Sequence, residues 1–195
     1  MDKRPAVFLD RDGCVNVEDS YIRDLAQLRL YPDSLNSIKK LNAAGLLVVI
    51  ITNQSGVARG YMTEDLVRRA HDLLLGWARE SGARIDGIYY CPHHPEGSQA
   101  PYAIHCQCRK PAPGMLRQAA EELGIDLAAS FVVGDKISDI ALGPAVGARA
   151  ALVRTGFGVA QLEKIESESL PMPDHVADGI GGAVEWILSF GGAGG

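Results

Sequence analysis

Short runs of apolar and β-branched residues recur along the chain as far as residue 155. Within each run the apolar residues do not alternate with polar ones, which is typical of strands buried on both faces of a parallel sheet. The pattern predicts strands at residues 6–10, 46–52, 87–91, 131–135 and 150–155.

Between these strands the apolar residues follow a helical spacing. Leu35, Ile38 and Leu41 share one face of the first predicted helix. Thr63 is the expected N-cap of the second, because its hydroxyl can accept a hydrogen bond from the first turn. The predicted helices cover residues 33–45, 63–82, 114–124 and 139–147. Strands that alternate with helices predict an α/β fold with a doubly wound, Rossmann-like parallel sheet and helices on both faces.

The length of the chain, 195 residues, favours a single domain over residues 1–195. Residues after 160 are expected to form a closing helix, and the glycine-rich end, residues 190–195, is expected to be a flexible tail. The predicted strands and helices leave too few residues for a large cap domain. Without a cap through which to dimerise, the protein is expected to be a monomer.

Composition narrows the functional classes. The formal net charge of −5 gives no basic surface of the kind that nucleic-acid-binding proteins carry. The longest apolar run, residues 46–51, is far shorter than the roughly 20 residues of a membrane span, and the N-terminus lacks the apolar region of a signal peptide. We therefore expect a cytoplasmic protein that binds neither nucleic acid nor a membrane.

Four polar or reactive residues stand at the carboxyl ends of predicted strands. They are Asp10, Thr52, Cys91 and Asp135. In doubly wound folds, ligands bind at this edge of the sheet. These residues are far apart in the sequence, and we expect them to share one site.

The same edge carries two acidic motifs. In FLDRDG, Asp10 and Asp12 are one residue apart as the chain leaves a strand, and in GDKISD, Asp135 is followed by Asp139 one helical turn later. Carboxylates this close repel each other unless a cation lies between them. Mg²⁺ takes few protein ligands, all of them oxygen atoms, and keeps water and phosphate oxygens for its other positions. The motifs therefore indicate a magnesium site.

Groups that can hold a phosphate stand nearby. The motif TNQSG supplies the Thr52 hydroxyl, the Asn53 amide and a turn at Ser55 whose backbone N–H groups can bind phosphate oxygens. The motif CRKP supplies Arg109 and Lys110, and the lysine can act as a point charge on a transferring phosphoryl group. Phosphoryl transfer requires little beyond such positioning and charge neutralisation.

The motifs FLDRDG, TNQSG, RKP and GDKISD resemble, in their order and placement, those of the haloacid dehalogenase (HAD) superfamily in its phosphatase branch. The resemblance extends to the last predicted strand. It implies that Asp10 is the nucleophile, forming an aspartyl-phosphate, and that Asp12 is the general acid and base. It also implies that Thr52 and Lys110 stabilise the phosphoryl group. The implied magnesium ligands are Asp10, Asp12, through its backbone oxygen, and Asp135.

Three of the four cysteines cluster between the third predicted strand and Lys110. With one histidine they offer a tetrahedral Cys₃His set for a structural zinc ion. The expected ligands are Cys91, His93, Cys106 and Cys108. His94 and His105 are alternatives to His93, which is preferred because the one-residue spacing of its pair matches that of the other pair. The insert, residues 91–110, is too short to build its own core, so zinc would order it as a lid and substrate selector near the active site.

Two other functions would require a different sequence. A catalytically silent, zinc-stapled binding module would be expected to lack Asp10, Asp12 or Lys110, and all three are present. A phosphomutase would need a mobile cap to reorient its intermediate, and the chain has no segment with which to build one. The favoured prediction is a hydrolytic enzyme.

Without a large cap, the crevice is open to a polar substrate of moderate size. Cationic side chains beyond Lys110 indicate a second negative group on that substrate, although Arg59 can equally form a surface ion pair. The residues expected to contact the substrate are Arg11, Glu18, Asp19, Ser20, Tyr21, Asn53, Gln54, Ser55, Arg59 and Arg109.

The longer motifs FLDRDGxxN, TNQSGVARGYMTE, YYCPHHPEG and CxCRKPxPGML resemble the heptose-bisphosphate phosphatase branch of the superfamily. This resemblance implies a small sugar bisphosphate as substrate, loss of its 7-phosphate, and a place in nucleotide-heptose synthesis for surface polysaccharide. The alternative is the related histidinol-phosphate phosphatase branch, which shares the zinc loop. That branch usually carries an aspartate where this chain has Ser55. Because a carboxylate there would repel a bisphosphate, Ser55 favours the first branch.

Overall fold

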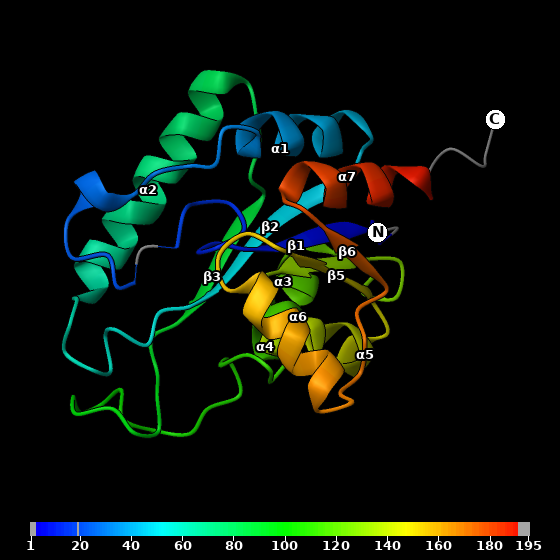
Figure 1. The fold of residues 1–195 in the computed structure, drawn as a ribbon. Coiled ribbons are helices and arrows are strands. Elements are labelled where there is room, and N and C mark those ends of the chain that lie inside the picture. Colours follow the sequence, from blue (N-terminus) through cyan, green and yellow to red (C-terminus); the bar gives the residue numbers. More distant parts are fainter. Residues whose placement is uncertain (1–2, 19, 191–195) are drawn as a thin grey trace.

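Six parallel strands form the central sheet of the computed structural model, which describes residues 3–18 and 20–190. They are β1 Ala6–Asp10, β2 Leu47–Asn53, β3 Gly87–Cys91, β4 Phe131–Gly134, β5 Arg149–Val153 and β6 His175–Ala177. Their spatial order is β3-β2-β1-β4-β5-β6 (Figure 1). The chain winds outward from β1 to β3 and then from β4 to β6 in the opposite direction. The strand order therefore reverses between β1 and β4, where doubly wound folds open a crevice for ligands.

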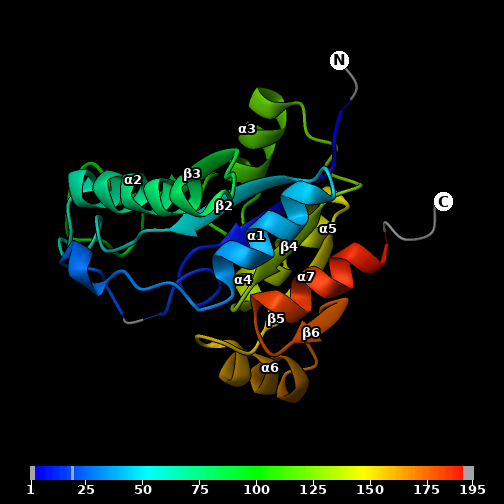
Figure 2. The same cartoon turned by 90° about the horizontal axis from the view of Figure 1, so that it is seen from above.

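Helices cover both faces of the sheet. They are η1 Leu25–Gln27, α1 Ser34–Ala43, α2 Glu64–Ser81, α3 Gly114–Leu123, α4 Ile137–Ile140, α5 Leu142–Val146, α6 Gly158–Ser167 and α7 Ile180–Ser189. Helices α1, α2 and α7 lie on one face, with α1 and α7 side by side, and α3, α5 and α6 lie on the other (Figures 1 and 2). The predicted fold class is confirmed.

The core explains why the strand sequences do not alternate. Val7 and Leu9 of β1 pack among the residues of α1, α2 and α7, while Phe8 packs against Met115 and Leu116 of α3 on the opposite face. Successive side chains of a strand point to opposite faces, so a strand covered on both sides must be apolar throughout. Each of these larger buried side chains contributes roughly 1.5–3 kcal/mol of hydrophobic stabilisation.

The five predicted strands are confirmed, two of them with the predicted ends and three with ends that differ by one or two residues. Thr63 is the N-cap of α2, where its hydroxyl accepts a hydrogen bond from the backbone N–H of Leu66 at 3.2 Å. The single helix expected at residues 139–147 is wrong, because this segment contributes to two short helices, α4 and α5. Pro144 lies in the first turn of α5, where a missing backbone N–H is tolerated, whereas in one continuous helix it would leave the carbonyl of Ile140 without its donor.

The region after residue 160 holds more structure than the expected closing helix and tail. Strand β6 extends the sheet beside β5, and α7 follows it. Phe190, the first residue of the predicted tail, caps α7 and contacts the Phe131 ring and the Arg149 guanidinium. The rest of that tail, residues 191–195, lies outside the described residues. In the described part of the chain, every helix is too short or too polar to span a bilayer.

Candidate active site

The carboxyl edge of the sheet gathers the predicted residues from four strands. Asp10 ends β1, Thr52 stands one residue before the end of β2, Cys91 ends β3 and Asp135 directly follows β4. Asp10 and Thr52 line a pocket at this edge. Asp135 is fully buried beneath it, and Cys91 lies in the neighbouring cysteine cluster.

Lys110 brings a buried positive charge to this pocket. Its ammonium Nζ lies 2.9 Å from Oδ1 of Asp10 and 2.6 Å from Oδ1 of Asp139, and it donates to the carbonyl of Ile51 at 3.1 Å. The residue is 4% exposed. Burial alone would lower the pKa of Lys110, but the charges of Asp10 and Asp139 raise it above its ordinary value, so the amine is charged.

The backbone of Lys110 is held by the side chain of Asn53. The lysine N–H donates to Oδ1 of Asn53 at 3.1 Å, and Nδ2 of Asn53 donates to the lysine carbonyl at 3.2 Å. The cysteine-containing loop is thereby joined to the end of β2. The Asn53 amide thus positions the lysine, and its expected contact with the substrate stays a prediction.

Asp10, Asp135 and Asp139 offer carboxylate oxygens that lie within 4.8 Å of one another. Burial, followed by the charge of Asp139, raises the pKa of Asp10 to about 6, and burial is also the largest cause that raises the pKa of Asp135 to about 6. Oδ1 of Asp135 is buried, accepts no hydrogen bond and lies 3.5 Å from the ammonium of Lys136. Crowded carboxylates with an unfilled acceptor fit a divalent cation with oxygen ligands.

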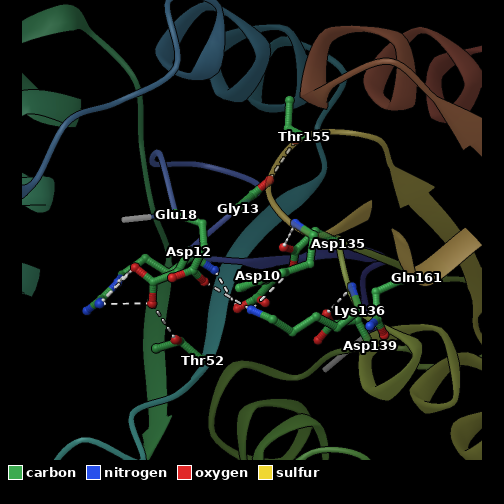
Figure 3. A network of polar contacts seen from close by, with 12 residues as sticks. Asp10, Asp12, Gly13, Glu18, Thr52, Asp135, Lys136, Asp139, Thr155 and Gln161 are labelled. Carbon is green, nitrogen blue, oxygen red and sulfur yellow. Dashed lines mark hydrogen bonds and ion pairs between the residues drawn. The ribbon is translucent and has the colours of Figure 1, made fainter. Parts of the chain in front are cut away.

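The carboxylate of Asp12 is directed away from that acidic group. Oδ1 accepts a hydrogen bond from Asn16 at 2.9 Å, Oδ2 accepts one from Gln54 at 2.8 Å, and the Arg11 guanidinium contacts both oxygens. In Figure 3, Asp12 lies on the Thr52 side of Asp10, and Asp135 and Asp139 lie on the other side. Burial would raise the pKa of Asp12, but the Arg11 charge and these hydrogen bonds lower it. The acidic group thus contains Asp139 in place of the Asp12 side chain, and a contribution from the Asp12 backbone oxygen stays a prediction.

Tight loops hold Asp135 in place. Its Oδ2 accepts a hydrogen bond from the backbone N–H of Phe157 at 2.8 Å. The hydroxyl of Thr155 donates to the carbonyl of Gly13 at 2.6 Å (Figure 3). Gly13 has a φ of +88°, and a Cβ atom at this position would collide with the Asp135 carboxylate. The glycine of FLDRDG is therefore required both by its backbone conformation and by the acid that it touches.

The cysteine loop brings together the four predicted ligand atoms of Cys91, His93, Cys106 and Cys108 within 4.8 Å. The three sulfur atoms lie 3.1–3.5 Å apart, and Nδ1 of His93 lies 3.3 Å from the sulfur of Cys108. His94 points elsewhere, with its Nε2 3.1 Å from the Arg59 guanidinium. Three thiols and one imidazole at these separations fit a tetrahedral zinc site.

The residues predicted to contact the substrate fall into three groups. Those that line the pocket are Glu18, Ser20, Tyr21, Asn53, Gln54, Ser55 and Arg109. Arg11 also contributes to the lining, but its side chain is only 1% exposed and pairs with Asp12 and His71, and its contact with the substrate stays a prediction. Arg59 lies outside the lining, against His94, and Asp19 is outside the described residues.

Lys136 lines the pocket although it was not predicted to do so. Its ammonium pairs with Glu18 at 3.1 Å and lies 4.8 Å from the centre of the Phe157 ring. Ser138 and Phe157 also line the pocket. The sequence did offer a signal for Lys136. It lies between Asp135 and Asp139 in the motif GDKISD, so it follows the same strand at the carboxyl edge of the sheet.

Two family models match the chain. A polynucleotide kinase 3 phosphatase model matches residues 10–142, and a HAD-hydrolase-like model matches residues 107–183. Among curated proteins, the chain is 46% identical over 154 residues to the D-glycero-β-D-manno-heptose-1,7-bisphosphate 7-phosphatase of Yersinia pestis, covering 78% of this chain and 81% of the relative. It is 48% identical over 145 residues to the protein of the same name in Rhodopseudomonas palustris, covering 74% and 81%.

Two solved structures with the heptose-bisphosphate phosphatase name are also similar to this chain. A D,D-heptose 1,7-bisphosphate phosphatase from B. bronchiseptica, complexed with magnesium and phosphate, aligns with a TM-score of 0.83 at 33% identity, covering 95% of this chain and 99% of that one. A D,D-heptose 1,7-bisphosphate phosphatase from Burkholderia thailandensis aligns with a TM-score of 0.70 at 32% identity, covering 95% and 99%.

Proposed function

This chain belongs to the HAD-like phosphatase family, and from that premise we propose that it removes the 7-phosphate of D-glycero-β-D-manno-heptose 1,7-bisphosphate. It is a phosphoric monoester hydrolase. The observation that carries the proposal is the buried Lys110 beside Asp10 at the strand-order reversal, in a chain 46% identical to an enzyme of that name. Phosphoryl transfer requires such positioning of the nucleophile and of a positive charge that offsets the charge on the phosphoryl oxygens.

In the first chemical step, a carboxylate oxygen of Asp10 attacks the phosphorus atom and the bond to the sugar oxygen breaks. Lys110 lies beside the attacking group and, with the Thr52 hydroxyl that lines the same pocket, offsets charge on the phosphoryl oxygens. Because its pKa is lowered in the free protein, Asp12 must first take up a proton from solvent, and it then gives that proton to the departing sugar oxygen. The products of this step are the sugar alcohol and an aspartyl-phosphate on Asp10.

In the second step, Asp12 takes a proton from a water molecule, whose oxygen attacks the phosphorus atom of the aspartyl-phosphate. Inorganic phosphate leaves and the carboxylate of Asp10 is restored. Asp12 regains the proton that it gave in the first step, so one residue serves both halves of the reaction. Splitting one displacement into two lowers the barrier that each step must cross.

Two metal ions fit the residues of the chain. The acidic group of Asp10, Asp135 and Asp139 would hold magnesium, which supplies positive charge to the phosphate when it is bound. The Cys₃His group would hold a structural zinc ion, which orders the loop that carries Arg109 and Lys110.

Two further cations support a substrate with a second phosphate. Arg109 and Lys136 both line the pocket, beyond the Lys110 ammonium that faces Asp10. Ser55 also lines it, so no carboxylate at that position repels an anionic group. Because the reported relatives carry the heptose-bisphosphate name, we set the histidinol-phosphate alternative aside. The expected pathway is nucleotide-heptose synthesis in the cytoplasm, and the monomeric state stays a prediction.

The test compares phosphate release from the heptose 1,7-bisphosphate and from histidinol phosphate at equal concentrations, with and without Mg²⁺. The proposal predicts magnesium-dependent hydrolysis that strongly prefers the bisphosphate. Asp10→Asn is the control, and it should leave less than about 1% of the rate because the amide cannot act as the nucleophile. Preference for histidinol phosphate would overturn the proposed substrate, and residual activity of Asp10→Asn above about 1% would overturn the assignment of Asp10 as the nucleophile.

A further inference from the structure

Arg11 is among the largest fully buried side chains of the protein. Its Nε and Nη2 atoms contact Asp12 at 3.1, 3.0 and 2.9 Å. A buried guanidinium is costly unless each of its N–H groups has a partner. Asn16 and Gln54 also hold the Asp12 carboxylate, but the contribution of Arg11 to its orientation depends on what holds the far side of the guanidinium.

His71 of α2 holds that far side. Nη1 of Arg11 lies 3.0 Å from Nε2 of His71. An arginine can only donate hydrogen bonds, so Nε2 is the acceptor and the ring proton is on Nδ1. The imidazole ring also meets the edge of the Tyr90 ring, with the ring centres 5.4 Å apart, which fixes its tilt.

The position of His71 on its helix is otherwise a core position. His71 is 6% exposed and shares the buried face of α2 with Val67, Leu74 and Ala78. The neighbouring positions on this face carry apolar residues, which bury without needing a partner. A hydrogen-bond acceptor here serves a group outside the helix, and that group is Arg11.

We propose that His71 is a positioning residue, which acts through Arg11 to hold the carboxylate of Asp12 in line for proton transfer. The inference rests on the proposed function, because it deepens the role of Asp12 as general acid and base. Without the acceptor, the Nη1 group of Arg11 has no partner in a buried environment, and the guanidinium turns to find one. The carboxylate of Asp12, which contacts this guanidinium, then loses its alignment with the substrate.

The test uses two polar substitutions of similar size. The Gln side chain in His71→Gln places an acceptor where Nε2 stands, whereas the shorter side chain in His71→Asn does not reach Arg11. Leu74→Ala is the matched control, because it weakens the same helix without touching the polar chain. The value of kcat/KM is measured for the heptose bisphosphate, whose alkoxide must be protonated as it leaves, and for p-nitrophenyl phosphate, whose leaving group departs without a proton.

His71→Asn should lower kcat/KM for the sugar substrate by about ten- to a hundredfold, part of the full effect of a general acid. In the same variant, kcat/KM for p-nitrophenyl phosphate should fall by less than about threefold. His71→Gln should keep a kcat/KM for the sugar substrate close to that of wild type. Equal losses on both substrates, or the same pattern in Leu74→Ala, would reduce His71 to a structural role and overturn the inference. Wild-type protein without magnesium-dependent activity would instead contradict the proposed function itself.

Discussion

Lys110 carries its charge between Asp10 and Asp139, and all three side chains are buried. Lys110→Met removes the cation and leaves two facing carboxylates. The free energy of unfolding, measured in urea without added magnesium, should fall by about 3–5 kcal/mol, and turnover should be lost. Adding Asp139→Asn to this variant should recover part of the stability but none of the activity. Wild-type stability of the single variant would contradict the charge arrangement.

A side chain at a glycine with a positive φ can destabilise the protein through backbone strain and through collision with a neighbour. Comparing Gly13 with Gly45 distinguishes these two effects. Both have left-handed backbone conformations, but Gly45 has open space around it, whereas a Cβ on Gly13 meets Asp135. Gly45→Ala should therefore cost only about 1–2 kcal/mol of unfolding free energy. Gly13→Ala should cost more and should also weaken magnesium binding, measured by isothermal titration calorimetry. Equal stability losses with unchanged magnesium affinity would show that Gly13 does not position Asp135.

The stability of the protein should depend on the protonation of His71. Burial, followed by the charge of Arg11, lowers the pKa of His71 from 6.5 to about 3. Below pH 6.5 the unfolded chain takes up a proton here and the folded protein does not. This contribution to stability is therefore complete above that pH and is lost as the pH falls from 6.5 toward 3.

In this pH range, the protonation of His71 should lower the free energy of unfolding by up to about 1.4 kcal/mol for each pH unit. We would measure the free energy of unfolding in urea for wild type and His71→Gln at about pH 7, 6 and 5. The difference between the two proteins isolates the contribution of His71, because both proteins contain the same carboxylates. Wild type should lose its advantage over His71→Gln as the pH falls. A difference between the two that stays constant over this range would mean that His71 is not held neutral in the folded protein.

The sequence predicted which residues lie near the site, but it did not predict which contacts their side chains make. Asp10, Asp12 and Lys110 could be placed near one site because their motifs follow strands or adjoin one another in the sequence. Arg11 lies between two site acids, but it follows β1 in a turn, and no local pattern reveals that its side chain is buried against Asp12 and His71. The role of Asn53 toward Lys110 depends on a contact across 57 positions of the chain, which no local pattern reveals.

Among the elements, the cysteine loop depends most on a bound ion. It leads from β3 to Arg109 and Lys110, and three of its residues with Cys91 form the proposed zinc site. Replacing both Cys106 and Cys108 by serine should remove zinc, measured by elemental analysis, and should open the loop to limited proteolysis. Cys14→Ala is the control, since Cys14 is a buried cysteine outside the cluster and its loss should leave the zinc content unchanged. Full zinc content in the double variant would refute the site.

Elements differed in how well the sequence predicted them. The long apolar runs of β1 and β2 were clear, because strands covered on both faces leave an uninterrupted signal. Strand β6 has three residues, His175–Ala177, which is too short for any periodicity to appear. The Cys₃His cluster could be predicted because potential metal ligands leave a local spacing in the sequence. The motif GDKISD places Lys136 near the same edge, but its contacts with Glu18 and Phe157 come from distant loops.

At the scale of the whole molecule, the order of strands decides the chemistry. Strands β1 and β4 are neighbours although more than a hundred residues separate them, and their ends bring Asp10 and Asp135 together. Strand β2 adds Thr52 on the other side of β1, and the loop after β3 adds Lys110. The parallel arrangement could be predicted from the alternation of strands and helices. The resemblance of the four motifs then indicated which edge residues act together.

The central claim is that the enzyme removes the 7-phosphate and leaves the phosphate at C1 in place. The most direct measurement is ³¹P nuclear magnetic resonance of the heptose 1,7-bisphosphate during turnover with Mg²⁺. The primary 7-phosphate signal should disappear, inorganic phosphate should rise in equal amount, and the anomeric 1-phosphate signal should remain. Loss of the anomeric signal with the 7-phosphate retained, or no change in either signal, would contradict it.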